Sequence, residues 1–432
     1  MFSEAKFIDA VERAARVVSG QLQTPIDIDR PIERVKLELS NEQEMSVSND
    51  TFGRKRRSTS IFPTPRGNVE VEEVFSLAEK NAEEDALKMC NNADARKQYI
   101  QRHGNRVLVT GQAGMGKSTL ARDLVQKLLE RKMLPATDLI FFVQCKDIDF
   151  SETLGLLDFL LRYCVADGED FAPNEKENIL LLIKRCRNIV FILDGLDEVN
   201  NQEFLSAIPK FHFTGKVPAI FLLRSLLNGN LLPQAKVLVT SRPRQAFELE
   251  PQDRPRTIVK ILGLNPSAQV ELGKQICGTD CPRVHKILRQ DPDLDSACYV
   301  PVFCTILYAV LHRHTASHGR GALNTMTRVM MYLLNTYLRS AHMRLINMEE
   351  LVKIAKFSRE GFASRKYVFH QSDISDAGIT GSAFQAFMYT YLGKFSWCCS
   401  LDMFWSLLFE MALAYLDLVW RASTLSSPST YV

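Results

Sequence analysis

The 432-residue sequence has no uninterrupted apolar run of the roughly eighteen residues that a membrane-spanning helix requires. The nearest approach, residues 395–420, is interrupted by Asp402, Glu410 and Asp417, so we interpret it as a buried helix rather than a span. No segment recurs at a period of roughly 20–50 residues, which argues against solenoid repeats. The chain is about three times as long as a typical domain, and we therefore expect more than one globular domain.

The sequence also lacks an excess of charge of either sign. Lys and Arg number 53 and Asp and Glu number 50, so the bulk charge indicates neither a nucleic acid nor a membrane surface as a specific partner. The ten cysteines have no regular short spacing, and the first residues lack a signal-peptide pattern. These absences predict a reducing, cytoplasmic location. Hydrophobic residues (46%) and charged residues (24%) occur in the proportions of ordinary folded proteins.

One group of cysteines deserves separate consideration as a metal site. Cys277, Cys281, Cys298 and Cys304 follow one another with His285 nearby. Their spacing matches no regular zinc knuckle, so we favour core and surface thiols over zinc ligands, which remain the alternative interpretation.

Residues 1–68 are expected to form an N-terminal region with a mobile linker. Phe7, Val11 and Val18 recur at helical spacing, and the segment that follows to Leu39 is compatible with short paired strands. From 40 to 68 the sequence is rich in Ser, Asn, Thr, Pro and charge, as is typical of a linker. Residues 69–103 regain a helical pattern, in which Leu87 is one of the apolar positions, and form a lead-in segment.

Short apolar runs alternate with helical patterns across residues 104–263. The runs are 107–110, 139–143, 189–193, 236–240 and 257–262. All-apolar strands separated by helices predict an α/β domain, with a parallel sheet covered by helices on both faces. Helical patterns then dominate residues 264–345, so a helical domain is expected to follow.

A glycine-rich run lies between the first of these strands and a helix. It consists of Gly111, Gln112, Ala113, Gly114, Met115, Gly116, Lys117, Ser118 and Thr119. The run fits the phosphate-loop pattern, in which glycines let backbone amides point at phosphate oxygens and the helix dipole adds positive potential. We assign Lys117 to the outer phosphates and the Ser118 hydroxyl to Mg²⁺.

Carboxylates follow the strand at 189–193. Asp194 falls at the carboxyl edge of the sheet, where open α/β sheets bind ligands, so we assign it to Mg²⁺, with water in between. Glu198 is the candidate group that orients or deprotonates an attacking water, and Asp197 is its rival.

A third polar segment follows the strand at 236–240. It reads Thr240-Ser241-Arg242-Pro243 and should lie near the γ-phosphate of a bound nucleotide. Arg242 is the candidate sensor of that phosphate, and Thr240 or Ser241 is a candidate water ligand.

The three motifs together resemble those of the NACHT domain, which occurs in NLR-type innate-immune and related signal-transduction ATPases. The loop at 111–119 resembles the family's nucleotide loop, the string Asp-Gly-Leu-Asp-Glu at 194–198 its acidic motif, and 240–243 its sensor. Residues 298–311 resemble the segment whose proline approaches adenine, which makes Pro301 the carried-over residue.

This resemblance implies a P-loop NTPase of the STAND class, with a helical domain and a partial winged-helix region at 346–392. The implied ligands are ATP or ADP with Mg²⁺, and the implied function is a signalling switch in which nucleotide exchange controls opening and oligomerisation. Self-association or other signalling proteins are the implied partners. Slow ATP hydrolysis is the only enzymatic activity that it suggests.

The sequence also departs from the family pattern. Residues 393–432 form a divergent tail in which 395–399 lacks the family's winged-helix histidine, and His370 lies too early to replace it. No leucine-rich repeats follow within these residues. One alternative is therefore a truncated or decoy regulator that binds nucleotide without switching. The other is a P-loop phosphotransferase, which is disfavoured because no cluster of basic lid residues is present.

Overall fold

The computed structural model describes residues 2–20, 37–39, 68–69, 71–112, 114–130, 134, 136–150, 152–165, 171–198 and 215–316, together with scattered residues between 323 and 379. The chain divides into two compact units. The first, called the α/β unit, comprises residues 1–23 and 32–262, and the second, called the helical unit, comprises residues 24–31 and 263–432.

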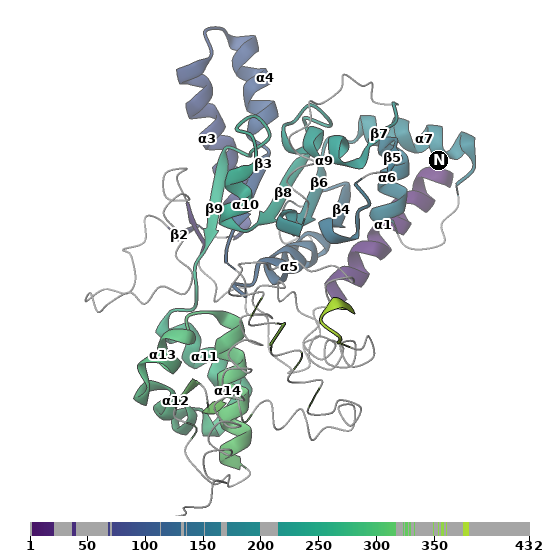
Figure 1. Ribbon diagram of the computed structural model, residues 1–432. Helices are drawn as coiled ribbons and strands as arrows, with labels where there is room; N and C mark the ends of the chain where they lie inside the picture. Colours follow the sequence, from purple (N-terminus) through teal and green to yellow (C-terminus); the bar gives the residue numbers. More distant parts are fainter. Residues whose placement is uncertain are drawn as a thin grey trace, which may run out of the picture. The chain divides into compact units, whose positions relative to one another are not determined.

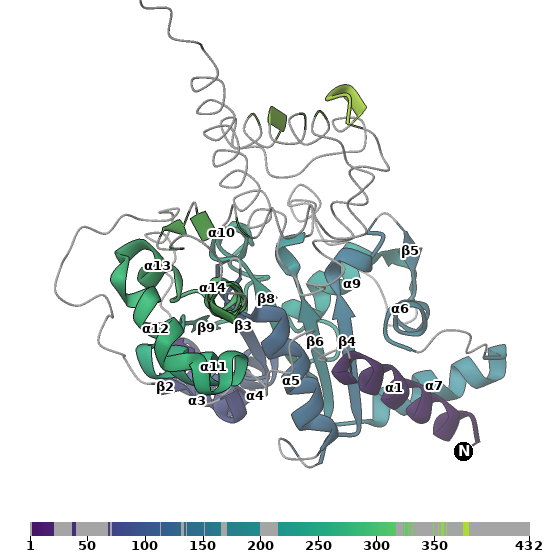
Figure 2. The ribbon, with the colours of Figure 1, turned by 90° about the horizontal axis from the view of Figure 1, so that it is seen from below.

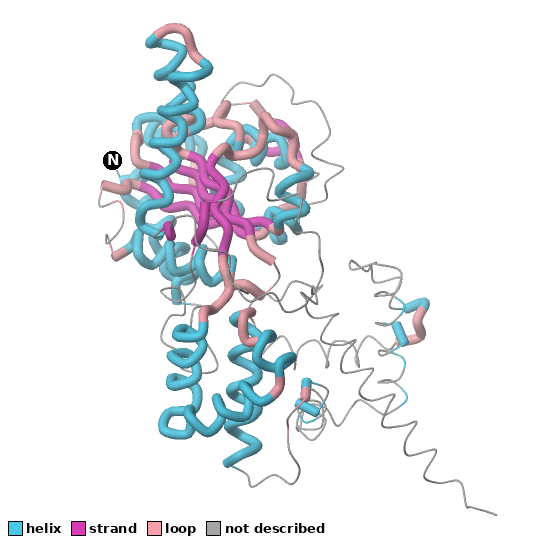
Figure 3. Tube along the Cα trace, turned by 90° about the vertical axis from the view of Figure 1, so that its left-hand side faces the viewer, coloured by secondary structure: helices cyan, strands magenta, loops and turns pink. Residues whose placement is uncertain are grey.

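A seven-stranded sheet forms the centre of the α/β unit (Figures 1 and 3). Its strands are β1 (Leu37–Leu39), β2 (Asn68–Val69), β3 (Arg106–Thr110), β4 (Leu139–Gln144), β6 (Ile189–Asp194), β8 (Lys236–Ser241) and β9 (Thr257–Ile261), in the order β2-β1-β9-β3-β8-β6-β4. The strands from β9 to β4 are parallel, as the apolar runs predicted. Strand β1 pairs antiparallel with β9, and β2 pairs antiparallel with β1, so the complete sheet is mixed.

Helices cover both faces of the parallel strands. The helices of this unit are α1 (Phe2–Gly20), α3 (Val74–Met89), α4 (Ala93–His103), α5 (Lys117–Leu129), α6 (Leu156–Tyr163), α7 (Pro173–Arg185), α9 (Ala219–Leu227) and α10 (Pro243–Glu248). Of these, α4 packs against α3 and has no buried residue. Three short 3₁₀ turns, η2 (Val71–Glu73), η3 (Cys145–Asp147) and η4 (Leu196–Glu198), lie between them. Two further strands, β5 (Thr153–Leu154) and β7 (Val217–Pro218), pair antiparallel in a small separate sheet.

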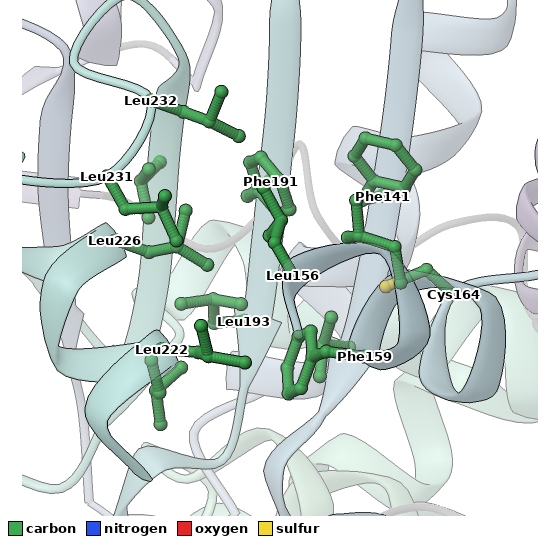
Figure 4. Packing of buried hydrophobic residues seen from close by; sticks show 14 of the residues in the cluster. Phe141, Leu156, Phe159, Cys164, Phe191, Leu193, Leu222, Leu226, Leu231 and Leu232 are labelled. Atoms are coloured by element: carbon green, nitrogen blue, oxygen red, sulfur yellow. The ribbon is translucent and has the colours of Figure 1, made fainter. Parts of the chain in front are cut away.

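The largest core cluster fills one face of the sheet, beneath α6 and α9 (Figure 4). Phe141 on β4 and Phe191 on β6 are register partners, and their rings stack with centroids 4.9 Å apart. Successive residues of a strand face opposite sides, and accordingly Leu193 belongs to this cluster whereas Ile192 is buried outside it. The apolar composition of the strands thus reflects burial on both faces.

The first helix is an integral part of the α/β unit. α1 packs against the edge strand β4 and against α5 and α7 (Figure 2). Phe7 and Ala10 are fully buried, and the Phe7 ring lies 6.4 Å from that of Phe141 and 6.1 Å from that of Phe171. The amphipathic helix was predicted, but the sequence analysis assigned it to a separate region that ends at residue 68.

Helices α3 and α4 form a hairpin that extends beyond the sheet (Figure 1). The buried residues of α3 are Val74, Phe75, Ala78, Ala82 and Ala86. Leu87, one of the apolar positions of the expected helical pattern, is 64% exposed. Three of the five buried positions of α3 are alanines, whose small side chains allow close helix–helix approach.

The helical unit contains α11 (Pro266–Cys277), η5 (Gly278–Asp280), α12 (Cys281–Gln290), α13 (Pro292–Ala297) and α14 (Pro301–Ala316). Helices were expected in this part of the chain, and the structure contains them. Gly273 on α11 allows α14 to approach closely, since a Cβ there would lie 2.3 Å from the Tyr308 ring. Almost all of the expected winged-helix region (346–392) and the whole tail (393–432) lie outside the described residues.

The four cysteines considered above as zinc ligands are buried in the helical unit. Burial raises the pKa of the Cys277 thiol to about 12, which keeps it protonated. Within the described part of the chain, no three or more His, Cys, Asp or Glu side chains are grouped so as to hold a metal ion. None of the helices that the structure describes combines the length and apolarity needed to cross a lipid bilayer.

Candidate functional site

The phosphate-loop motif forms a turn between β3 and α5. Gly114 (φ 76°) and Gly116 (φ 92°) adopt the left-handed conformation that side chains disfavour. Gly116 is the N-cap of α5 and accepts the first backbone hydrogen bond of the helix from Leu120. The backbone amides of the first turn of α5 lie next to the loop, and a helix N-terminus in this position is the arrangement that binds phosphate.

Lys117 and Ser118, the two side chains assigned to phosphate and Mg²⁺, both lie at the start of α5. Lys117 is half-buried, and its ammonium donates to the carbonyl of Gly111 over 2.8 Å, which holds the cation across the turn. Ser118 is buried at the start of α5. The inner face of the helix is formed by Leu120, Leu124 and Leu128, all at most 2% exposed.

The end of β6 is hydrogen-bonded to the end of β8. The Thr240 hydroxyl donates to Asp194 Oδ1 over 2.7 Å and accepts from the Gly195 amide over 2.9 Å. Thr240 is fully buried and Asp194 is 6% exposed. The sequence analysis considered Thr240 as a water ligand, whereas the structure engages its hydroxyl with the acidic motif.

A second link joins the same two segments. Arg242 Nε lies 2.7 Å from Asp197 Oδ2, and the two side chains are 16% and 4% exposed. The contact is an ion pair rather than an aligned hydrogen bond, and Asp197 Oδ1 has no hydrogen-bond partner among the described residues. Two of the predicted catalytic residues are thus paired with each other.

The tip of β8 connects all three motifs. On one side the Ser241 carbonyl accepts a hydrogen bond from the Gly111 amide over 3.2 Å, which joins the tip to the phosphate loop. On the other side Thr240 and Arg242 reach the acidic turn. This follows from the strand order, because β8 lies between β3 and β6. The motifs that the sequence places far apart therefore meet at one edge of the sheet.

The oxygen donors at this edge are compatible with Mg²⁺. Asp194 supplies a carboxylate, Ser118 supplies a hydroxyl, and Asp197 Oδ1 is a buried oxygen without a hydrogen bond from the described residues. Mg²⁺ prefers such hard oxygen ligands, and it is commonly held by one or two carboxylates together with substrate phosphates. A Mg²⁺ ion that is bound together with a nucleotide therefore needs only a few ligands from the protein.

The ligand roles assigned to the site residues all stay predictions, and three of these residues are not part of the geometry described above. Ala113 and the side chain of Glu198 lie outside the described residues, although the Glu198 backbone ends η4. Pro301 begins α14 in the helical unit, and its proximity to adenine stays a prediction. Conversely, sequence reasoning missed the bond from Thr240 to Asp194. A hydroxyl at the end of an otherwise apolar strand was the available signal.

Comparison with known proteins identifies the domain that carries these three motifs. Residues 105–276 match the sequence profile of the NACHT domain. The chain contains a NACHT domain. This match begins just before β3 and ends within α11. The chain is 26% identical to part of human "NACHT, LRR and PYD domains-containing protein 12" over 299 residues, which are 65% of this chain and 27% of that protein. It is also 26% identical to human protein 10 of that name, over 65% of this chain and 43% of the relative.

A longer alignment extends to bovine "NACHT, LRR and PYD domains-containing protein 3", which is 20% identical over 89% of this chain and 35% of the relative. The chain thus spans less than half the length of these curated relatives. Among solved structures, the Thermotoga maritima RuvB branch-migration motor aligns with a TM-score of 0.33 and 13% identity, over 75% of this chain and 86% of RuvB. The fold assignment here rests on the strand order and the loop of the NACHT domain itself.

Proposed function

We propose that this chain binds ATP and ADP with Mg²⁺ at the phosphate loop and acts as a nucleotide-controlled signalling switch of the innate-immune type. The observation that carries the proposal is the junction at the tip of β8, where the phosphate loop, the acidic turn and Arg242 are joined by direct bonds. The membership of residues 105–276 in the NACHT family supports it.

Each element of the loop contributes to phosphate binding. The left-handed glycines and the amides of α5 provide donors for phosphate oxygens, and Lys117 provides a cation. Mg²⁺ would be held by Ser118 and Asp194 and would neutralise negative charge on the phosphates. The ammonium of Lys117 is kept at the loop by backbone carbonyls, so little side-chain ordering is needed for it to reach a ligand.

We assign the discrimination between bound ATP and bound ADP to Arg242. Its guanidinium is paired with Asp197 at the edge of the sheet. A terminal phosphate that reached this edge would offer the arginine a second anionic acceptor, which ADP lacks. A ligand shifts a conformational equilibrium only through contacts that differ between states, and Arg242 is a group whose contacts can differ.

Glu198 is the proposed group that activates water, at a slow rate suited to a switch. Asp197 is less suited to this role because its pairing with Arg242 occupies one of its oxygens. Asp194 Oδ1 is likewise occupied by Thr240. Glu198 directly follows Asp197 in the acidic motif and is the remaining candidate in it.

The first experiment identifies the nucleotide that the purified, desalted protein carries. The protein is denatured, and the released nucleotide is identified and quantified by chromatography. Near-stoichiometric ADP would support the proposal, whereas a protein that remains empty after incubation with ATP or ADP and Mg²⁺ would contradict it. Light scattering during chromatography in ADP and in a non-hydrolysable ATP analogue then tests self-association. Tight binding with no change in mass would favour the decoy alternative.

A further inference from the structure

The side chain of Thr240 has a specific arrangement that the roles assigned so far do not use. Its hydroxyl has one proton to donate, and that proton is directed at Asp194 Oδ1 over 2.7 Å. The hydroxyl oxygen of Thr240 in turn accepts a hydrogen bond from the Gly195 amide over 2.9 Å. Thr240 is 0% exposed, so water does not compete for either bond. Both partners belong to the acidic motif, which lies on a different strand.

These two bonds fix the orientation of Asp194. Oδ1 is held by the Thr240 hydroxyl, and this is the one hydrogen bond that the carboxylate makes among the described residues. A bond from a hydroxyl to an ionised carboxylate is roughly twice as strong as one between neutral groups. The carboxylate is therefore held with one oxygen engaged in the protein and the other available to a metal ion or its water.

The same hydroxyl also stabilises the turn that follows Asp194. Gly195 has a φ of 82°, so the chain leaves β6 through a left-handed residue. Its amide is buried and bonds to Thr240 rather than to a backbone carbonyl of the sheet. Without this hydroxyl, the buried Gly195 amide would lose its acceptor, and Oδ1 of Asp194 would lose the donor that holds it in place.

We propose that Thr240 is a positioning residue for Mg²⁺, which acts by orienting Asp194 and which does not itself touch the ion or the nucleotide. This inference rests on the proposed nucleotide site. Removal of a residue that hydrogen-bonds to a metal-ligating carboxylate typically changes metal affinity or activity by roughly 10- to 100-fold. The effect on Mg²⁺ dependence should therefore be large, whereas the loop that binds the phosphates stays intact.

The test compares Thr240→Val, Thr240→Ser and Thr257→Val in the full chain. Valine replaces the hydroxyl by a methyl group of similar size, and serine retains the hydroxyl. Thr257 is the matched control because it is also buried in the sheet, and its hydroxyl accepts from the Asn81 side chain over 3.1 Å, at the opposite end of the strands. This control reports the general effect of losing a buried threonine hydroxyl.

The measurement is the binding of a fluorescent ADP or ATP analogue as Mg²⁺ is titrated, with a parallel titration in EDTA. For T240V we expect the Mg²⁺ concentration that supports binding to rise roughly 10- to 100-fold, with affinity in EDTA unchanged. T240S and T257V should titrate like the wild type. A second measurement, hydrogen exchange of the segment that contains Gly195, should show faster exchange in T240V alone.

The outcomes separate this inference from the proposed function. If the wild type binds no nucleotide, both are wrong. If the wild type binds and T240V has a normal Mg²⁺ dependence, the positioning role is wrong and the nucleotide site stands. An equal shift in T240V and T257V would reduce the effect to general destabilisation and would also overturn the inference. Should T240V fail to fold, Thr240→Ala lacks the same hydroxyl without adding a methyl group at its position, and the same result is expected.

Discussion

The guanidinium of Arg242 neutralises the carboxylate of Asp197 across a 2.7 Å gap between the tip of β8 and the acidic turn. The two groups come from segments separated by more than forty positions, and the side chain of Asp197 is only 4% exposed. A buried charge is costly unless it is paired, so the arginine is required for this turn to keep an ionised acid in its interior. The pair gives Arg242 a structural role in addition to any contact with phosphate.

A double-mutant cycle at this pair tests its strength. Arg242→Ala leaves a buried carboxylate without its partner, and the free energy of unfolding should fall by up to about 3–5 kcal/mol. Asp197→Asn should be less harmful, and the double variant should be more stable than the sum of the two effects implies, by about 0.5–3 kcal/mol. Urea unfolding of each variant provides the measurement.

The exposed pair of Arg162 and Glu152 provides the control for that cycle. Their side chains are 56% and 26% exposed, and the pair lies in the same α/β unit. Pairs of this kind contribute about 0–1 kcal/mol, so the corresponding cycle should be nearly additive. Equal coupling energies in the two cycles would show that burial of Asp197 gives the first pair no special strength.

Lys117→Ala should abolish nucleotide retention. The ammonium of Lys117 lies over the loop, and its loss removes the side-chain cation that the proposal directs at the outer phosphates. The nucleotide content of the denatured, purified variant is compared with that of the wild type and of Lys97→Ala, which removes an exposed lysine from α4. Unchanged retention in the Lys117 variant would contradict the assignment of the loop.

Glu198→Gln should preserve nucleotide binding and slow hydrolysis. The amide cannot accept a proton from water, but it keeps the size of the side chain, so the phosphate loop should be unaffected. Release of inorganic phosphate in single turnover is the measurement, with Asp197→Asn in parallel. Normal turnover in E198Q together with a large loss in D197N would transfer the role of base to Asp197.

Much of this site could be predicted because its local chemistry is written in short motifs. The apolar runs specify the parallel strands, and Gly116 marks the left-handed entry into α5. The bonds between motifs could not be predicted in the same way, because they depend on strand order. β8 separates β3 from β6, and only this arrangement brings Thr240 to Asp194. The position of α1 was missed for the same reason, since an amphipathic pattern shows a buried face but not the surface that covers it.

Phe7→Ala should destabilise the α/β unit, because α1 is part of its core. The Phe7 ring is fully buried against Phe141 and Phe171, and the truncation of a buried phenylalanine to alanine typically costs about 3–5 kcal/mol. Val17→Ala is the matched control on the same helix, since Val17 is 59% exposed and its truncation should change stability by less than about 0.5 kcal/mol. Thermal unfolding monitored by circular dichroism would compare the two variants. Equal midpoints would mean that α1 is not packed on β4 in solution and that the N-terminal region is separate, as the sequence alone suggested. A lower midpoint for F7A alone would make α1 a structural element of the nucleotide-binding unit.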